Sequence, residues 1–163
     1  MAQRLLTKKV LIIGSEGYIG SRLYQYLEPR YSVKKVDICW FNNITGFSRD
    51  YSSVSKEELA EFNVVILLAG HPSVQSCEGP LKGPWKNNVT NFIDLLSKIN
   101  NQLLIYASSA SVYGNQDSSC YYDETNTKFT PINNYDITKY VLDLHGLSAI
   151  KERKVLLGCG SEQ

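Results

Sequence analysis

Short apolar runs alternate along the chain with segments in which apolar residues recur every three or four positions. The run VVILLA is apolar throughout, as expected of a strand that is buried on both faces. The periodic segments have the spacing of helices with one apolar face. The pattern predicts strands at Lys9–Ile13, Ser32–Ile38, Val64–Ala69, Leu103–Ala107 and Lys154–Leu157. It predicts helices at Gly17–Leu27, Lys56–Glu61, Pro84–Ile99 and Asn134–Ala149.

This alternation of strands and helices predicts an α/β domain with a doubly wound parallel sheet. The length of 163 residues suits one such domain. Right-handed crossovers lead us to expect the strand order 3-2-1-4-5. Two connections, Cys39–Val54 and Val112–Asn133, are long for a compact domain, and loops of that length are typical of functional segments.

Composition narrows the range of partners. A net charge of +1 argues against nucleic acid, because phosphate binding usually requires a basic stripe. No apolar stretch is long enough to span a membrane, and the polar N-terminus runs directly into the first strand without a secretory signal. We therefore expect a cytoplasmic protein. The four cysteines share no metal-ligand spacing with each other or with the two histidines, which predicts free thiols and no metal site.

Three glycines follow the first predicted strand and open the first predicted helix. Gly14 suits a tight turn, Gly17 lets a pyrophosphate approach the backbone, and Gly20 lets helix and strand pack closely. The N–H groups and the positive dipole end of the helix would then face the phosphates. In this strand–turn–helix context the spacing predicts a dinucleotide-binding site.

Asp37 closes the second predicted strand, where a carboxylate can accept hydrogen bonds from both hydroxyls of a ribose. The same carboxylate would repel the 2′-phosphate of NADP, and Ile38, Cys39 and Trp40 provide no arginine to neutralise it. The sequence therefore favours NAD over NADP. A glycine-rich turn and a surface aspartate in another α/β fold is the alternative interpretation.

A tyrosine and a lysine lie four residues apart in the last predicted helix, at Tyr135 and Lys139. This spacing places them one above the other on a helix face. An ammonium at that distance stabilises a phenolate and lowers the tyrosine pKa, so that the phenol can act as an acid or base near neutral pH. The fourth strand ends in a serine-rich stretch, Ser108–Ser111, at the sheet edge where ligands bind in open α/β folds. A solvated Tyr–Lys pair is the alternative for the helix motif taken by itself.

The chain resembles the extended short-chain dehydrogenase/reductase family, and within it the UDP-glucose 4-epimerase-like proteins. The resemblance rests on six segments in the family's order: GSEGYIG, VDIC, VILLAG, NNVTNFIDLL, YASSASVYG and YDITK. It covers about Lys8 to Leu144. It implies a Rossmann fold and an NAD-dependent epimerase or dehydratase that acts on a nucleotide-sugar by transient hydride transfer.

The resemblance assigns roles to individual residues. Ser109, Tyr135 and Lys139 match the catalytic triad, in which the tyrosine takes a proton from a sugar hydroxyl and the lysine also holds the nicotinamide ribose. Asp50 falls where relatives place an aspartate near adenine, and His71 is interpreted as a loop residue beside the cofactor without a role in proton transfer. The implied cofactor-binding residues are Gly14, Gly17, Tyr18, Ile19, Gly20, Asp37, Ala69, Gly70, Asn88 and Lys139. For Asn88, a helix polar residue satisfied by the backbone is the alternative.

Two departures from the family pattern affect the function. Ala110 and Ser111 stand where sugar 4,6-dehydratases carry an Asp–Glu pair, so dehydration is disfavoured and epimerisation or simple redox chemistry remains. The family also continues for a further lobe that grips the nucleotide-sugar, so we expect a chain truncated after the fifth strand, by a truncated gene or as a fragment, or else a degenerate or minimal relative. Two hypotheses follow. The first is an enzyme, either an NAD-dependent nucleotide-sugar epimerase or a reductase that acts on a similar substrate. The second is a truncated module that binds NAD without turnover.

Relatives pair through two long helices, which correspond here to Pro84–Ile99 and Asn134–Ala149. The resemblance therefore implies a homodimer with a four-helix interface. The apolar faces for that interface would come from Phe92, Leu95, Leu96, Tyr140 and Leu144, although some of these must pack on their own sheet.

Overall fold

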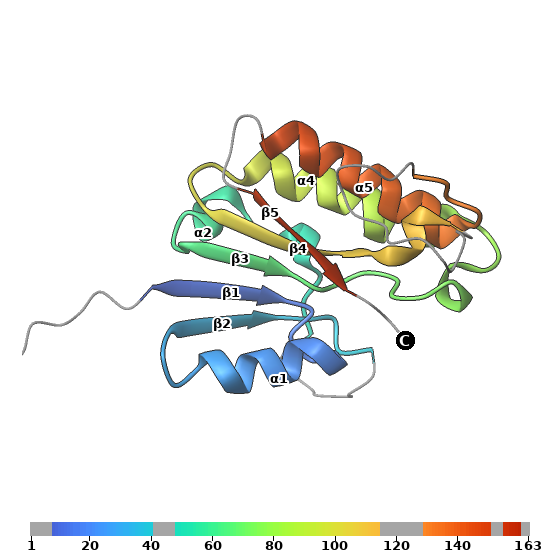
Figure 1. Ribbon diagram of the computed structural model, residues 1–163. Coiled ribbons are helices and arrows are strands. Elements are labelled where there is room, and N and C mark those ends of the chain that lie inside the picture. The colour runs from blue at the N-terminus through green and yellow to red at the C-terminus, as the bar shows by residue number, and fades with distance from the viewer. Residues whose placement is uncertain (1–7, 41–47, 115–128, 151–154, 161–163) are drawn as a thin grey trace, which may run out of the picture.

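A computed structural model describes residues 8–40, 48–114, 129–150 and 155–160. Its centre is a parallel sheet of five strands (Figure 1). The strands are β1 (Lys9–Ile13), β2 (Ser32–Val36), β3 (Val64–Leu67), β4 (Leu103–Ser109) and β5 (Val155–Gly160). Parts of both long predicted loops lie outside the described residues, namely most of Val112–Asn133, which includes Cys120, and part of Cys39–Val54. The same holds for Lys154, the first residue of the fifth predicted strand. The predicted α/β class with a doubly wound parallel sheet is confirmed.

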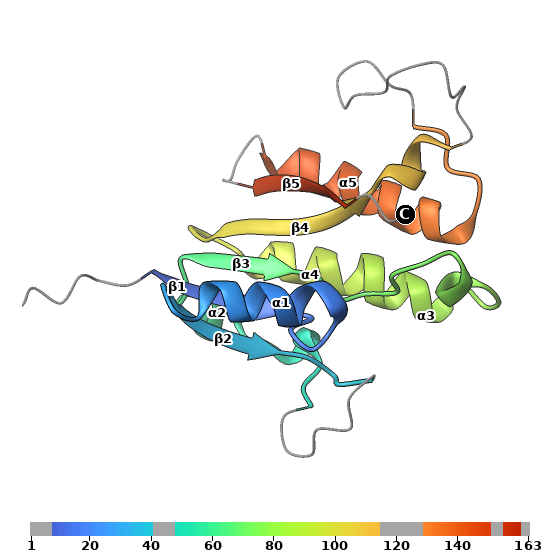
Figure 2. The same cartoon turned by 60° about the horizontal axis from the view of Figure 1, so that its bottom comes forward.

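Helices cover both faces of the sheet (Figure 2). On one face lies α1 (Tyr18–Leu27), and on the other lie α2 (Lys56–Leu59), α4 (Asn91–Lys98) and α5 (Asn134–Ile150). Shorter turns complete the described chain: η1 (Tyr51–Ser53), η2 (Gln75–Cys77), α3 (Lys82–Trp85), the π-helical turn η3 (Lys86–Thr90) and η4 (Ala110–Tyr113). None of the helices in the described ranges combines the length and apolar character needed to cross a membrane.

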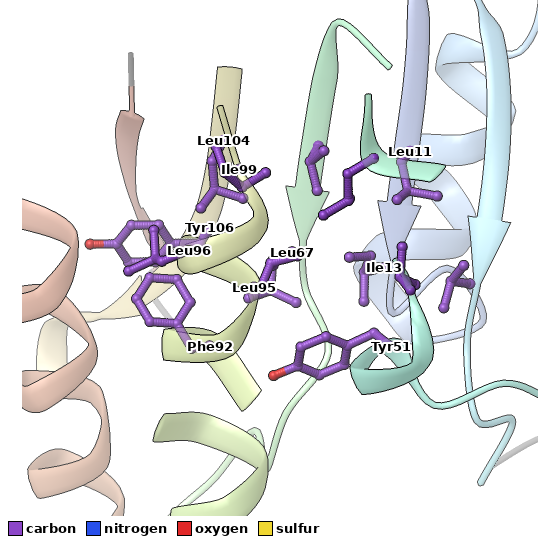
Figure 3. Packing of buried hydrophobic residues seen from close by; sticks show 14 of the residues in the cluster. Leu11, Ile13, Tyr51, Leu67, Phe92, Leu95, Leu96, Ile99, Leu104 and Tyr106 are labelled. Atoms are coloured by element: carbon purple, nitrogen blue, oxygen red, sulfur yellow. The ribbon is translucent and has the colours of Figure 1, made fainter. Parts of the chain in front are cut away.

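The inner strands β1 and β3 are almost entirely apolar because each of their two faces packs in a separate core. Val10 and Ile12 pack against α1, while Leu11 and Ile13 belong to the larger core on the opposite face. Figure 3 shows this larger core. The predicted interface residues Phe92, Leu95 and Leu96 lie in it and are buried, so they do not form an outer face. The exposed apolar residues of α4 and α5 are Ile93, Ile137, Leu144 and Leu147.

The predicted strand order 3-2-1-4-5 is wrong, because the observed order is β2-β1-β3-β4-β5. Strand β3 pairs with β1, as in the register of Leu67 with Ile13, and does not lie outside β2. The reason is burial. Strand β3 is apolar on both faces and therefore favours the centre of the sheet, where helices pack on both sides, whereas the half-exposed β2 can lie at the edge. In the described residues, the outer side of β2 carries only an isolated parallel bridge between Asp37 and Ser48.

The helix predicted at Pro84–Ile99 is present as the contiguous helical residues 82–98, but it contains a π-helical turn that the sequence did not predict. The segment is divided into α3, the wider turn η3 and α4, and it ends at Lys98. Single π-helical turns within helices are rare and often occur at functional sites. The hydroxyl of Tyr51 donates to the carbonyl of Asn87 in this turn (2.8 Å). The side chain of Asn88 leaves the same turn toward two other elements, as described below.

Candidate active site

The glycine loop between β1 and α1 depends on two glycines for its own shape. Gly14 has a φ of +89°, and a Cβ on it would lie 2.5 Å from the backbone nitrogen of Ala69. A Cβ on Gly20 would collide with the carbonyl oxygen of Gly14. Gly17 differs, because its φ of −71° is ordinary and a Cβ on it would be 3.4 Å from the nearest atom. The fold therefore requires Gly14 and Gly20, whereas the absence of a side chain at Gly17 leaves room for a ligand.

The first turn of α1 is open to an anion. Gly17 occupies the N-cap, and no side chain forms a cap hydrogen bond there. The helix N–H groups at such a terminus, together with the dipole, attract phosphate. Tyr18 and Ile19, which the sequence assigns to the cofactor, are 77% and 56% exposed beside this turn.

Asp37 follows β2 directly and joins that strand to the glycine loop. Its Oδ2 accepts a hydrogen bond from the backbone N–H of Glu16 (2.8 Å), and its Oδ1 accepts one from the backbone N–H of Cys39 (2.6 Å). The two bonds fix the plane of the carboxylate. Because a carboxylate has about four acceptor positions, capacity remains on both oxygens for ribose hydroxyls.

A pocket at the carboxyl edge of the sheet brings together several residues that the sequence assigns to the cofactor. Asp37 lines it from the end of β2, and Ala69 and Gly70 line it from the end of β3. Asp50 and Tyr51 of the long loop form another wall. Sequence analysis did not assign Trp40, Arg49, Asn87 or Asn91 to the site, although Asn87 and Asn91 belong to the segment NNVTNFIDLL.

Asn88 links the pocket to the helix that carries the Tyr–Lys pair. Its Oδ1 accepts from the backbone N–H of His71 (2.7 Å), and its Nδ2 donates to the carbonyl of His71 (3.3 Å) and to Oγ1 of Thr138 (3.0 Å). Gly70 admits this contact, because a Cβ there would lie 2.6 Å from Asn88 Oδ1. Both donors of the amide bond to protein atoms, so the structure shows Asn88 as a connector, and its contact with a cofactor stays a prediction.

His71 lies between the pocket residues. Its Nδ1 is 3.3 Å from Nδ2 of Asn87, and its ring packs edge-on against Trp40 at 5.7 Å between centroids. Burial lowers the pKa of His71 below its ordinary value, so the neutral imidazole is favoured. These contacts place His71 against two residues that line the pocket, Trp40 and Asn87.

The Tyr–Lys pair lies at the start of α5. Asn133 begins this helix by accepting a hydrogen bond from the N–H of Asp136 through its side-chain oxygen (2.9 Å). Tyr135 and Lys139 are both buried, with 5% and 8% of their surfaces exposed. The Nζ of Lys139 lies 5.8 Å from the ring centroid of Tyr135 and donates to the carbonyl of Ala107 in β4 (3.0 Å). The lysine thus joins the tyrosine's helix to the strand that ends at the serines.

Ser109 is the last residue of β4 and begins the turn η4. Its Oγ accepts from the backbone N–H of Ser111 (3.2 Å) and lies 2.8 Å from the hydroxyl of Ser111. Helix α5 packs against both β4 and η4. The structure therefore brings the end of β4 and the start of α5 to one edge of the sheet, the edge that also carries the glycine loop and the pocket.

A buried carboxyl that sequence reasoning missed lies one helical turn beyond Lys139. Oδ2 of Asp143 accepts a hydrogen bond from the hydroxyl of Ser108 (2.5 Å). The hydroxyl of Tyr106 lies beside the same helix, where a Cβ on Gly146 would collide with it. Burial raises the pKa of Asp143 above its ordinary value, and the bond from Ser108 opposes that rise. Asp143 and Ser108 are 35 positions apart, so no local pattern in the sequence connects them.

Replacing Asp143 with asparagine is expected to make the protein's stability less dependent on pH. The unfolded chain releases the aspartate proton near its ordinary pKa of 3.8, whereas the folded chain holds the proton to higher pH. The wild-type protein therefore loses stability as the pH rises from 3.8 to the higher folded pKa. Asp143→Asn carries no such proton, so its stability relative to wild type should rise as the pH increases from 4 to neutral. Urea unfolding between pH 4 and pH 8 measures this difference, and a gain that is largest at the acidic end would contradict the assignment.

Comparison with known proteins adds to the geometry. The model of the NAD dependent epimerase/dehydratase family matches residues 10–155. The comparison with curated proteins found no match.

Among solved structures, the chain is similar to UDP-glucuronic acid 4-epimerase from Bacillus cereus in complex with UDP-glucuronic acid and NAD, with a TM-score of 0.78 and 23% identity over 91% of this chain and 55% of that one. It is also similar to UDP-glucose 4-epimerase from Brucella ovis in complex with NAD, with a TM-score of 0.79 and 20% identity over 94% of this chain and 51% of that one. For UDP-N-acetylglucosamine 4-epimerase from Methanobrevibacter ruminantium M1 the TM-score is 0.81, with 21% identity over 94% of this chain and 54% of that one. The chain thus spans about half the length of these structures.

Proposed function

Because the chain belongs to the NAD-dependent epimerase/dehydratase family, we propose that it binds NAD and serves in the epimerisation of a nucleotide-sugar. One observation carries the proposal: Lys139 lies a helical turn from Tyr135 and contacts β4 at Ala107, two residues before Ser109. This arrangement shares a sheet edge with a glycine loop in which Gly17 leaves space for a ligand.

The residues present fit a dinucleotide. The loop at Gly17 and the uncapped start of α1 offer N–H groups for a pyrophosphate. Asp37 offers a carboxylate, already oriented by Glu16 and Cys39, for the hydroxyls of the adenosine ribose. The pocket between Asp37, Tyr51 and Ala69 would hold the adenine. When bound, NAD supplies the acceptor and the later donor of hydride.

The chain's own residues would handle the proton. The phenolate of Tyr135 takes the proton from a sugar hydroxyl, and the phenol so formed returns it. The ammonium of Lys139 stabilises the phenolate before the first step and after the second. Ser109, held in place by the N–H of Ser111, would donate a hydrogen bond to the reacting sugar oxygen. The bond from Lys139 to Ala107 keeps the ammonium at this position.

Calorimetric titration of the protein with NAD, and then with a UDP-sugar, tests the proposal. We expect NAD to bind in the micromolar range, the usual range for a reversibly bound substrate or cofactor. Formation of NADH from bound NAD on addition of the sugar nucleotide, measured by fluorescence, supports the epimerase. Binding of NAD without NADH formation supports a module that binds the cofactor without turnover. Failure to bind NAD at all would contradict both hypotheses.

A homodimer is the second part of the proposal. Four apolar side chains on α4 and α5 remain between 37% and 44% exposed, and they would be covered by the same helices of a second copy. They are Ile93, Ile137, Leu144 and Leu147. Sedimentation equilibrium decides between monomer and dimer.

A further inference from the structure

Three charged side chains meet beside the glycine loop, at the end of β2. Lys35 lies in β2, and Asp37 is the first residue after this strand. The two are two positions apart, so their side chains project on the same face of the strand. That face is the one that α1 covers, since the Nζ of Lys35 lies 4.7 Å from the ring centroid of Tyr24. The third group is Glu16 of the loop.

Glu16 contacts both of the other groups. Its backbone N–H donates to Asp37 Oδ2 (2.8 Å), and its carboxylate oxygen Oε1 pairs with the ammonium of Lys35 (2.8 Å). The hydroxyl of Ser15 also approaches this oxygen (3.4 Å). The side chain of Glu16 is only 12% exposed, so the pair is shielded from solvent more than an ordinary surface ion pair. Glu16 therefore links Lys35 to Asp37, the carboxylate that is proposed to bind the ribose.

The thiol of Cys39 lies against Asp37, with its Sγ 3.8 Å from the carbonyl oxygen of that residue. Burial is the main cause that raises the pKa of Cys39, followed by the carboxylates of Asp37 and Glu16, while Lys35 lowers it. Because Glu16 contacts both Asp37 and Lys35, all three charges lie close to any group that binds at Asp37. Two carboxylates and one ammonium leave one net negative charge at this place.

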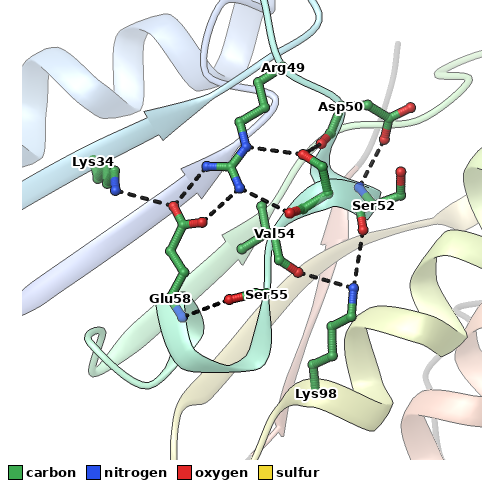
Figure 4. Close-up of polar contacts among 9 residues, drawn as sticks. Lys34, Arg49, Asp50, Ser52, Val54, Ser55, Glu58 and Lys98 are labelled. Atoms are coloured by element: carbon green, nitrogen blue, oxygen red, sulfur yellow. Dashed lines mark hydrogen bonds and ion pairs between the residues drawn. The ribbon is translucent and has the colours of Figure 1, made fainter.

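Arg49 is a second cation near the pocket, and its guanidinium has other partners. It pairs with both carboxylate oxygens of Glu58 (2.7 and 2.9 Å) and donates to the carbonyl of Ser53 (Figure 4). Lys98 donates to the carbonyls of Ser52 and Val54 on the other side of the same turn. These cations hold η1 in place. Arg49 and Lys98 thus have partners in or next to η1, whereas the partner of Lys35 is Glu16, which also contacts Asp37.

We propose that Glu16 is a second determinant of cofactor choice: together with Asp37 it disfavours the 2′-phosphate of NADP, and it occupies the lysine that would otherwise bind that phosphate. The inference rests on the proposed binding of NAD and deepens it. A 2′-phosphate placed at Asp37 would meet two carboxylates, and the nearest ammonium would already be paired. Removal of the Glu16 charge takes away one of the two carboxylates and also releases the ammonium of Lys35. Removal of the Asp37 charge takes away one carboxylate but leaves Lys35 paired.

Titration of the protein with NAD and with NADP, in parallel calorimetric experiments, tests the inference without need for turnover. The measured quantity is the ratio of the two dissociation constants, NADP over NAD. For Glu16→Gln, which keeps the backbone donor and the size of the side chain, this ratio should fall about tenfold, the effect of one charge at a partly shielded site. In the double variant Glu16→Gln/Lys35→Met, the ratio should return most of the way to its wild-type value, because the released ammonium is also removed. Glu61→Gln, on an exposed side chain of the same charge, is the matched control and should leave the ratio unchanged.

The outcomes separate this inference from the proposed function. If wild type binds NAD and the ratio in Glu16→Gln stays at its wild-type value, the inference fails and the proposed function stands. A fall that persists in full in the double variant overturns the role of Lys35. If wild type binds neither cofactor, the proposed function fails, and the inference with it.

Discussion

Replacing Gly20 with alanine is expected to destabilise the protein by about 3 kcal/mol, at the upper end for an overpacked site. A Cβ at Gly20 would collide with the carbonyl oxygen and carbon of Gly14 and the Cα of Ser15. These are backbone atoms at the junction of β1 and α1, so no side chain can rotate away. Relief would require α1 to move off the sheet and to lose its packing through Leu23 and Leu27. Because domains are stable by only about 5–15 kcal/mol, the loss is a large fraction of the total.

The matched comparison is Gly17→Ala in the same loop. A Cβ there would be 3.4 Å from its nearest neighbour and the backbone conformation is ordinary, so stability should stay within about 1 kcal/mol of wild type. Affinity for NAD should nevertheless fall sharply, because the new methyl group would occupy the space proposed for the pyrophosphate.

Gly83→Ala is the control for the change in affinity. Gly83 lies in α3 directly before Pro84, so a Cβ there meets the proline ring and should lower stability by about 1 kcal/mol, while affinity for NAD should not fall. Urea unfolding and NAD titration of the three variants separate structural from ligand-binding glycines. A stable Gly20→Ala, or a Gly17→Ala that binds NAD as wild type does, would contradict this division.

The sequence predicts the strands and the glycine loop well, for a physical reason. Strands covered on both faces must be apolar throughout, and a turn that brings two backbones together must use glycine, so both constraints leave direct traces in the sequence. The carboxyl edge where Asp37, Ala69 and the serines meet also follows from parallel strands. The predicted grouping of Asp37 with Ala69 and Gly70 in one pocket is therefore a consequence of topology.

Features that depend on contacts between distant segments are not predictable in this way. The position of β3 beside β1 depends on how far helices bury each position in the sheet, and the periodicity of apolar residues does not indicate this. The wide turn η3 depends on partners outside the helix, namely Tyr51 for the carbonyl of Asn87 and the His71 backbone for Asn88. The pair of Glu16 with Lys35 joins positions 19 residues apart, and nothing in either local motif indicates it.

Replacing Tyr135 with phenylalanine is expected to lower hydride transfer to NAD from a UDP-sugar by at least about 100-fold, the usual contribution of a positioned acid–base group. The change removes one oxygen and keeps the ring, which is 5% exposed and packed at the start of α5. Affinity for NAD should change little, because the pyrophosphate and ribose contacts lie on the glycine loop and Asp37. Fluorescence of the NADH formed measures the first effect, and calorimetry measures the second.

Tyr140→Phe provides the control one residue beyond the lysine. Tyr140 contacts Phe129 through its ring, at 5.1 Å between centroids, and phenylalanine preserves this contact. Hydride transfer in Tyr140→Phe should therefore remain close to that of wild type. If Tyr135→Phe and Tyr140→Phe lose activity equally, the phenol of Tyr135 has no special part in proton transfer. If Tyr135→Phe loses NAD affinity together with activity, the residue acts in binding, and the acid–base group must be sought elsewhere at this sheet edge.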